Sequence, residues 1–214
     1  VMKNQLRIIG GDWKRRTLPF ASIQGLRPTP DRVRETLFNW LMWDIQNSQV
    51  LDLCSGSGAL AFEALSRGAA KVVMIEPNPI QARFLKENIQ LLKAENCQLL
   101  TLTAQQALKQ LNTHFEVVFL DPPYDLALWE ELAELADPII TENAFIYVEA
   151  DRELSQLKLP SSWQKIKETK DGVNLNIIKN DINKLNNQRT ILIDNIKDIQ
   201  NKLSYNFVSK VCFN

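Results

Sequence analysis

Two short segments of the sequence combine residue types that could perform chemistry. One is a glycine turn, DLCSGSG, at residues 52–58, and the other is a proline turn, DPPY, at residues 121–124. Each turn follows an apolar run that predicts a β-strand. Because parallel sheets bind ligands beyond the carboxyl ends of their strands, we expect both turns to line one shared site.

The glycine turn has the properties of a cofactor loop. Glycines between a strand and a helix let the backbone approach a ligand closely, since they carry no Cβ. Glu76 ends the next predicted strand, 20 residues after Gly56, where its carboxylate could accept both ribose hydroxyls of an adenosine. The spacing also fits the G-x-G-x-x-A turn of NAD-binding proteins, and a turn that only joins a strand to a helix is a third interpretation. Asp52 favours the zwitterionic methionine end of S-adenosylmethionine, because a carboxylate in front of the turn would repel a pyrophosphate.

The proline turn has the properties of an amine-binding loop. The exocyclic amine of a nucleic-acid base is a poor nucleophile, because its lone pair is delocalised into the ring. Acceptors aimed at its N–H groups favour the tetrahedral geometry that attack on a sulfonium methyl requires. The Asp121 side chain and the Pro122 carbonyl can supply these acceptors, the prolines stiffen the loop, and Tyr124 can stack on an unpaired or extruded base. We therefore predict catalytic roles for Asp121, Pro122, Pro123 and Tyr124, the alternative being a rigid turn without a reactive role.

The elements around both turns predict an α/β fold. Strand candidates lie at residues 50–54, 71–76, 98–103, 116–121 and 144–149, and helix candidates at 59–67, 79–93, 105–111 and 128–136. This alternation predicts a Rossmann-like domain with a parallel sheet and helices on both faces. Residues 165–168 and 173–178 could add an antiparallel pair at the sheet edge.

The two ends of the chain depart from this pattern. Residues 6–9 and 13–18, joined by a glycine turn, predict a hairpin, and a helix is expected from about residue 30 to 44. We assign residues 1–28 to a basic hairpin and link, 29–180 to the Rossmann-like domain, and 181–214 to an atypical tail rich in Asn, Ile and Lys. The tail is either an extra helix that packs on the domain or on a partner, or the product of a shifted reading frame.

Composition and charge narrow the class of function. The chain has 25 Lys and Arg and 25 Asp and Glu, yet residues 1–36 hold eight cations against three anions, as a phosphate-contacting surface would. A solvated basic arm without a partner is the alternative. No apolar run approaches the roughly 20 residues of a membrane span, and residues 1–7 contain no secretory signal, so we expect a cytoplasmic protein. Three scattered cysteines and a single histidine, His114, predict neither disulfides nor a metal centre.

Several segments together resemble one known family. They are RIIGG at residues 7–11, LRPTPDRVRETLFNWL at 26–41, GSGAL at 56–60, EALSRGA at 63–69 and the DPPY turn. Over about residues 5–179 the chain is similar to the RsmD family, bacterial guanine-N2 methyltransferases of 16S ribosomal RNA. The resemblance implies a class I S-adenosylmethionine-dependent methyltransferase fold, a seven-stranded sheet with a small N-terminal β-hairpin. It also implies action on the small ribosomal subunit or its precursor, and we expect the protein to be a monomer.

The resemblance also implies contacts for the cofactor and for RNA. S-adenosylmethionine would lie over the glycine turn with Glu76 on its ribose, and Gln106 is the nearest equivalent of an Asp or Asn that meets the adenine amine. The expected cofactor contacts are Asp52, Cys54, Gly56, Ser57, Gly58, Glu76, Pro77, Gln106, Ala107 and Asp121. The expected RNA contacts are a subset of Arg7, Lys14, Arg15, Arg16, Arg27, Arg32 and Arg34.

Two rival functions stay open at this point. A DNA adenine-N6 methyltransferase can use the same acceptor loop, although such enzymes usually carry a sizeable target-recognition domain. A non-catalytic RNA-binding assembly factor, or a nucleotide-binding module, could keep the fold without the reaction. The intact residues Asp121, Pro122 and Tyr124 argue against lost catalysis.

Overall fold

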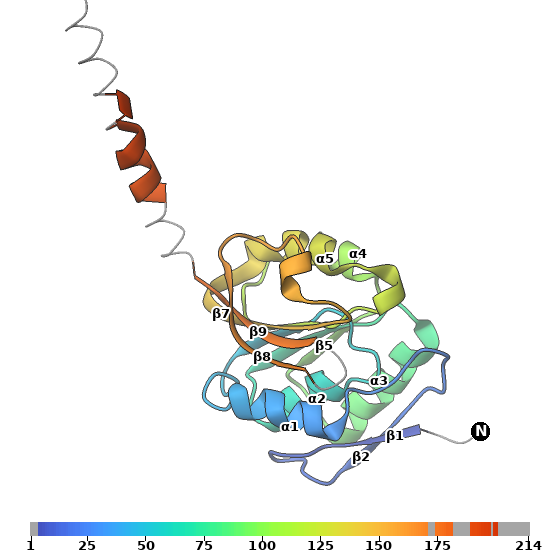
Figure 1. Ribbon diagram of the computed structural model, residues 1–214. Helices are drawn as coiled ribbons and strands as arrows, with labels where there is room; N and C mark the ends of the chain where they lie inside the picture. Colours follow the sequence, from blue (N-terminus) through green and yellow to red (C-terminus); the bar gives the residue numbers. More distant parts are fainter. Residues whose placement is uncertain (1–3, 171–173, 182–188, 198, 201–214) are drawn as a thin grey trace, which may run out of the picture. The chain divides into compact units, whose positions relative to one another are not determined.

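The computed structural model describes residues 4–170, 174–181, 189–197 and 199–200 (Figure 1). The chain forms two compact units, Val1–Asn180 and Asp181–Asn214. In the second unit, residues 189–197 and 199–200 are helical. These described residues include exposed large apolar side chains, namely Ile191, Leu192, Ile193, Ile196 and Ile199.

The first unit is built on a seven-stranded sheet. In chain order its strands are β3 (Gln49–Asp52), β4 (Lys71–Ile75), β5 (Cys97–Leu100), β6 (Phe115–Leu120), β7 (Ile140–Ala150), β8 (Trp163–Lys170) and β9 (Asn174–Asn180). The order across the sheet is β5-β4-β3-β6-β7-β9-β8, with parallel pairing from β5 to β7 and antiparallel pairing of β9 with both neighbours. The predicted α/β class and the closing antiparallel pair are confirmed. The order reverses at β3, the position at which doubly wound sheets bind ligands.

Helices cover both faces of this sheet (Figure 1). The helices α1 (Asp31–Trp40), α2 (Ala59–Ser66) and α3 (Pro79–Leu92) share one apolar cluster with β-strand residues such as Val50 and Val72. The helices α4 (Ala104–Leu108) and α5 (Trp129–Ala136) share the other cluster with Leu51 and Val73. Neighbouring residues of one strand thus enter opposite cores, as the alternation of side chains along a strand requires. The residues of this unit that the structure describes also form three short 3₁₀ helices: η1 (Tyr124–Leu126), η2 (Asp137–Ile139) and η3 (Leu154–Gln156).

The N-terminal hairpin consists of β1 (Asn4–Arg7) and β2 (Thr17–Phe20), which pair antiparallel as a separate two-stranded sheet. The predicted second strand began too early, because residues 12–15 form turns. Gly11 and Arg15 both adopt positive φ angles, of 73° and 71°, and this conformation interrupts a strand. The predicted helix after the link was also too long, since α1 ends at Trp40.

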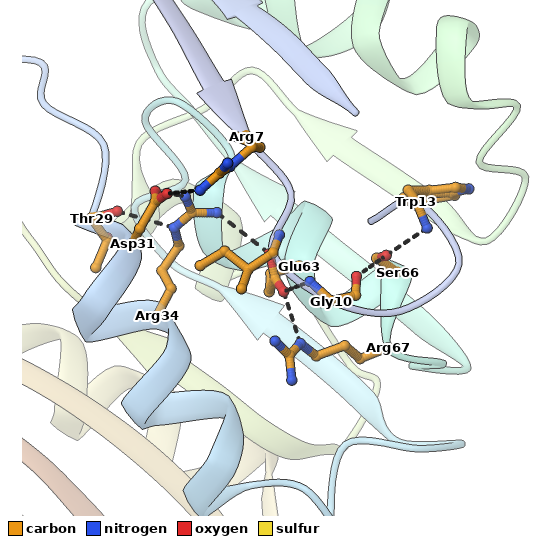
Figure 2. A network of polar contacts seen from close by, with 10 residues as sticks. Arg7, Gly10, Trp13, Thr29, Asp31, Arg34, Glu63, Ser66 and Arg67 are labelled. Carbon is orange, nitrogen blue, oxygen red and sulfur yellow. Dashed lines mark hydrogen bonds and ion pairs between the residues drawn. The ribbon is translucent and has the colours of Figure 1, made fainter. Parts of the chain in front are cut away.

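A buried polar network fastens this hairpin to the helical layer (Figure 2). Its centre is Glu63 of α2, whose side chain is fully buried. The Glu63 carboxylate accepts hydrogen bonds from the backbone N–H groups of Ile9 at 2.9 Å and Gly10 at 2.8 Å. It also pairs with Arg34 Nη1 at 3.4 Å and Arg67 Nε at 2.8 Å. The charge of Glu63 is therefore matched by two guanidinium groups and two backbone donors.

The docking of the hairpin turn on α2 requires a glycine at position 11. The Asp12 N–H donates to the Ser66 carbonyl at 2.8 Å, and Ser66 Oγ donates to the Gly10 carbonyl at 2.6 Å. A Cβ at Gly11 would lie 1.8 Å from the Ser66 carbonyl oxygen, and a Cβ at Gly10 would lie 2.6 Å from the Arg67 guanidinium. A side chain at Gly11 would collide with the α2 backbone, so this glycine lets the two backbones meet, whereas a Cβ at Gly10 would displace only the end of the Arg67 side chain.

Arg34 corrects one expectation from the sequence. The sequence predicts it as an RNA contact, but the Arg34 side chain is only 1% exposed. Its guanidinium donates to the Thr29 carbonyl at 3.1 Å and pairs with Asp31 at 2.6 Å as well as with Glu63. Arg34 is a structural residue that joins α1, α2 and the segment before α1, and it cannot reach RNA from this position.

Candidate active site

The two chemically suggestive turns lie side by side at one edge of the sheet. The glycine turn follows β3 and the proline turn follows β6, and these strands are parallel neighbours with Asp52 opposite Phe119. Four carboxylates end four strands that are adjacent in the sheet: Glu76 after β4, Asp52 on β3, Asp121 after β6 and Glu149 on β7. Acidic side chains thus gather at the carboxyl edge.

The glycine turn is fixed by its own backbone and by β4. Gly56 and Gly58 have φ angles of 50° and 81°, which glycine tolerates best. A Cβ at Gly58 would lie 2.5 Å from the Phe62 ring, so this position also needs glycine for packing. Ser55 Oγ accepts a hydrogen bond from the Ile75 N–H at 3.1 Å and ties the turn to the end of β4. The sequence offered no role for Ser55, and the structure gives it this one.

Glu76 lies beside the glycine turn. Its side chain is buried, and one carboxylate oxygen accepts the Asn78 N–H at 2.8 Å. Burial raises the pKa of Glu76 above its usual value, while hydrogen bonds from the backbones of Asn78 and Gly56 oppose that rise. Asn78 in turn caps α3 by accepting from the N–H groups of Ile80 and Gln81, with Pro79 at the first helical turn. A carboxylate with spare lone pairs therefore stands next to the Gly56 backbone.

Asp52 has an unusual environment for an acid. It is 2% exposed, and its Oδ2 atom has no hydrogen-bond partner. Burial raises the pKa of Asp52 to about 7, and the charge of Glu76 adds to the rise, although a hydrogen bond from the Cys54 backbone opposes it. A buried acceptor without a partner destabilises the protein by roughly 1–3 kcal/mol unless a ligand supplies a donor. The position therefore fits the ammonium group or positive charge of a bound molecule.

Asp121 of the proline turn is perturbed more strongly. Burial, followed by the negative charges of Glu149 and Asp52, raises the pKa of Asp121 well above its usual range. Among the described residues, no Lys or Arg forms an ion pair with any of the four edge carboxylates. Their shared negative charge would repel a pyrophosphate and attract a cation.

The aromatic side chain of the proline turn is held on two sides. Tyr124 Oη donates to Glu149 Oε1 at 2.8 Å, and its ring packs against Trp129 with the ring centroids 5.9 Å apart. Trp129 Nε1 donates to the Glu149 carbonyl at 2.8 Å, and Tyr147 Oη donates to Glu149 Oε2 at 2.9 Å. Burial and the charge of Glu149 raise the pKa of Tyr124, so the phenol stays protonated. Sequence reasoning missed Glu149, although it ends a predicted strand just as Glu76 does.

The expected cofactor contacts divide into two groups. Asp52, Cys54, Gly56, Ser57, Gly58, Glu76, Pro77 and Asp121 all lie on the turns at the carboxyl edge. Gln106 is different: its Oε1 accepts the Thr103 N–H at 3.1 Å while Thr103 Oγ1 accepts the Gln106 N–H at 3.2 Å, a capping box for α4. The carbonyl that was expected to meet an adenine amine thus already serves the helix, and neighbouring Ala107 is buried in the core.

The expected RNA contacts are mostly at the surface. Lys14, Arg15, Arg16, Arg27 and Arg32 are exposed. Arg7 is exposed as well, but its guanidinium pairs with Asp31 at 3.2 Å.

The other expectations from the sequence concern His114, metal binding and membrane spans. His114 lies at the surface, as predicted. Within the described part of the chain no cluster of His, Cys, Asp and Glu could hold a metal ion, and no helix is long and apolar enough to cross a membrane.

Comparisons with known proteins agree with this geometry. Residues 6–180 match a family described as conserved hypothetical protein 95. The chain is 44% identical over 177 residues to ribosomal RNA small subunit methyltransferase D of Haemophilus influenzae, covering 80% of this chain and 91% of that protein. It is 43% identical over 170 residues to the protein of the same name from Escherichia coli K12, covering 78% and 86%. A solved structure described as a putative methyltransferase, yhhF, from Escherichia coli superposes with a TM-score of 0.78 at 41% identity, covering 83% of this chain and 99% of the other.

Proposed function

The chain belongs to the RsmD family of ribosomal RNA small subunit methyltransferases, and from that membership we propose that it methylates the exocyclic N2 of a guanine in 16S ribosomal RNA. One observation carries the proposal. Four carboxylates without a cationic partner among the described residues, Glu76, Asp52, Asp121 and Glu149, end adjacent strands at a single edge. This edge suits a cationic methyl donor beside an amine.

The glycine side of the site fits S-adenosylmethionine. Glu76 accepts the ribose hydroxyls, and the Gly56 and Gly58 backbones allow close approach of the ligand. The unpartnered Oδ2 of Asp52 fits the donor's positive charge at its methionine end. When bound, the cofactor supplies the methyl group and a sulfonium that leaves as a neutral thioether. A dinucleotide would instead bring a pyrophosphate against Asp52 and Glu76, which disfavours the NAD interpretation.

The proline side of the site fits an amine on a flat base. Asp121 and the Pro122 carbonyl accept hydrogen bonds from the two amine N–H groups and so favour a tetrahedral nitrogen. Tyr124, fixed by Glu149 and Trp129, stacks on the base once the base has left its helix. After transfer the nitrogen carries one proton too many, and Asp121 accepts it directly or through water. The raised pKa of Asp121 makes this carboxylate a better proton acceptor than an ordinary aspartate.

The RNA side of the proposal rests on the N-terminal extension. Residues 1–28 would bind RNA phosphates, residues 29–180 would carry out the reaction, and residues 181–214 receive no role. The exposed cations Lys14, Arg15, Arg16 and Arg27 lie on the extension, which Glu63 anchors to the domain. The positively charged surface of the extension pairs with RNA phosphates. It therefore favours an assembled ribosomal particle or its precursor as the substrate.

Transfer of labelled methyl groups tests this function. Purified full-length protein is incubated with labelled S-adenosylmethionine and unmodified small ribosomal subunits, free 16S RNA or duplex DNA. Label should appear in RNA from the subunits, and digestion followed by mass spectrometry should identify N2-methylguanosine. Labelled N6-methyladenine in DNA would establish the rival enzyme. Binding to subunits without cofactor binding or transfer would instead indicate an assembly factor.

A further inference from the structure

The segment that joins the hairpin to α1, residues 21–30, contains no helix or strand of its own. We call it the link. It is held to the domain at its start by a hydrogen bond from the Ala21 N–H to Gln81 Oε1 at 2.9 Å. Farther along, Leu26 reaches the glycine turn, since a Cβ at Gly56 would lie 3.0 Å from Leu26 Cδ1. The link therefore runs from the RNA-facing extension to the cofactor turn.

Gln81 joins these two parts through one side chain. It lies in the first turn of α3 and is only 1% exposed. While its Oε1 accepts from the link, its Nε2 donates to the Gly56 carbonyl at 2.7 Å. The backbone of Gly56 also lies close enough to Glu76 to lower the pKa of that carboxyl, so both Gln81 and Glu76 act on this glycine. A single amide thus fixes the start of the link and the turn that would lie under the cofactor.

We propose that Gln81 is a positioning residue that couples RNA binding on the extension to cofactor binding over Gly56. The inference rests on the function proposed above and adds a regulatory contact to the same site. Ordering the link and ordering the glycine turn require the same Gln81 amide to be in place. A ligand that orders one therefore lowers the entropic cost of ordering the other, and the linkage must be reciprocal.

Asn88 offers a matched control within the same helix. It is two turns farther along α3, also 1% exposed, and its Nδ2 donates to the Pro19 carbonyl of β2 at 2.9 Å. Asn88 thus holds the hairpin by the same kind of bond, but this bond goes to β2 and not to the glycine turn. Comparing the two amides separates a general loosening of the extension from a loss of coupling.

The coupling is measured as a ratio of dissociation constants. Radiolabelled S-adenosylhomocysteine is bound to the full chain by equilibrium dialysis, alone and with saturating unmodified small subunits. In the wild type the subunits should tighten binding about 5-fold, the lower end of usual couplings. Gln81→Glu keeps the acceptor for Ala21 but loses the donor to Gly56, so it should weaken binding to the free protein about 10-fold and bring the ratio to one. Gln81→Met, which loses both bonds without adding a charge, should do the same, whereas Asn88→Leu should keep the wild-type affinity and ratio.

The outcomes distinguish this inference from the proposed function. Wild-type protein that transfers methyl groups but shows a ratio of one would overturn the coupling alone. So would folded Gln81 variants that keep the wild-type ratio, or an Asn88→Leu variant that loses it. Wild-type protein that neither binds S-adenosylhomocysteine nor transfers methyl groups would overturn both. Thermal unfolding of each variant identifies those that are folded.

Discussion

Glu63 and Asp52 are both buried carboxylates, yet their surroundings are opposite. Glu63 is met by two guanidinium groups and two backbone N–H groups, so its charge is fully paired inside the protein (Figure 2). Asp52 has one oxygen without any partner, and three further carboxylates end the neighbouring strands. A paired buried charge holds structure together, whereas an unpaired one costs stability and persists where a ligand pairs with it. The contrast shows that Glu63 belongs to the structural framework of this protein, whereas Asp52 belongs to its candidate active site.

Removing the reactive carboxylate should have the largest effect. Asp121→Ala deletes an acceptor for the amine and the proton acceptor, so methyl transfer to unmodified subunits should fall by about 1,000-fold. Affinity for S-adenosylhomocysteine should stay within a few-fold, because the other edge carboxylates remain. Exposed Asp125, four residues on, provides the control, and Asp125→Ala should leave transfer unchanged. Near-normal turnover in Asp121→Ala would remove Asp121 from the reaction.

Breaking the paired charge should damage the fold instead of the chemistry. Glu63→Gln removes the carboxylate charge that pairs with Arg67 and one of the two carboxylate charges that pair with buried Arg34, so the free energy of unfolding should fall by about 3 kcal/mol in urea titrations. The matched control is Glu87→Gln, which breaks an exposed pair with Arg83 and should change stability by less than about 0.5 kcal/mol. Equal stabilities for the two variants would mean that the buried network does not fasten the hairpin.

Neutralising the unpaired charge should stabilise the cofactor-free protein. The pKa of Asp52 is about 7 in the folded state against 3.8 ordinarily, so the folded state holds its proton more tightly than the unfolded state. Wild-type stability should therefore decline by roughly 4 kcal/mol from this group as the pH rises from about 4 to about 7. Asp52→Asn should lack this part of the decline and should bind S-adenosylhomocysteine more weakly. Urea titrations of both proteins across this range test it, and parallel pH profiles would contradict the assignment.

The features of the site that the sequence predicted are local ones. The glycine turn, Glu76 and the proline turn each directly follow an apolar run, and the end of a strand is visible in one sequence. The capping role of Gln106 was also visible locally, because Thr103 stands three residues earlier and the pair forms a capping-box pattern.

What the sequence could not supply depends on contacts between distant segments. Arg32 and Arg34 stand two positions apart on α1, and only packing against α2 decides that the second is buried with Glu63. Glu149 gains its importance from Tyr124, which lies 25 residues away in the chain. Gln81 bonds to Ala21, which lies 60 residues away. Hydrophobic periodicity predicts strands and helices, but it carries no information about such polar partners.

The smallest expected effect is that of removing exposed positive charges from the N-terminal hairpin. Arg15 and Arg16 are exposed on the turn that Glu63 anchors through Ile9 and Gly10. Replacing both by Ala should weaken binding to unmodified subunits several-fold near physiological salt and reduce the slope of log affinity against log salt by about 1 to 2. The fold should be unaffected, because neither guanidinium belongs to the buried network.

Replacing Arg83 and Lys86, two exposed cations of α3, by Ala removes the same charge from another surface and should leave the slope unchanged. Equal slopes of log affinity against log salt in both double variants would show that the anchored hairpin does not contact phosphate. The buried network around Glu63 would then hold the hairpin in place without any role in RNA binding.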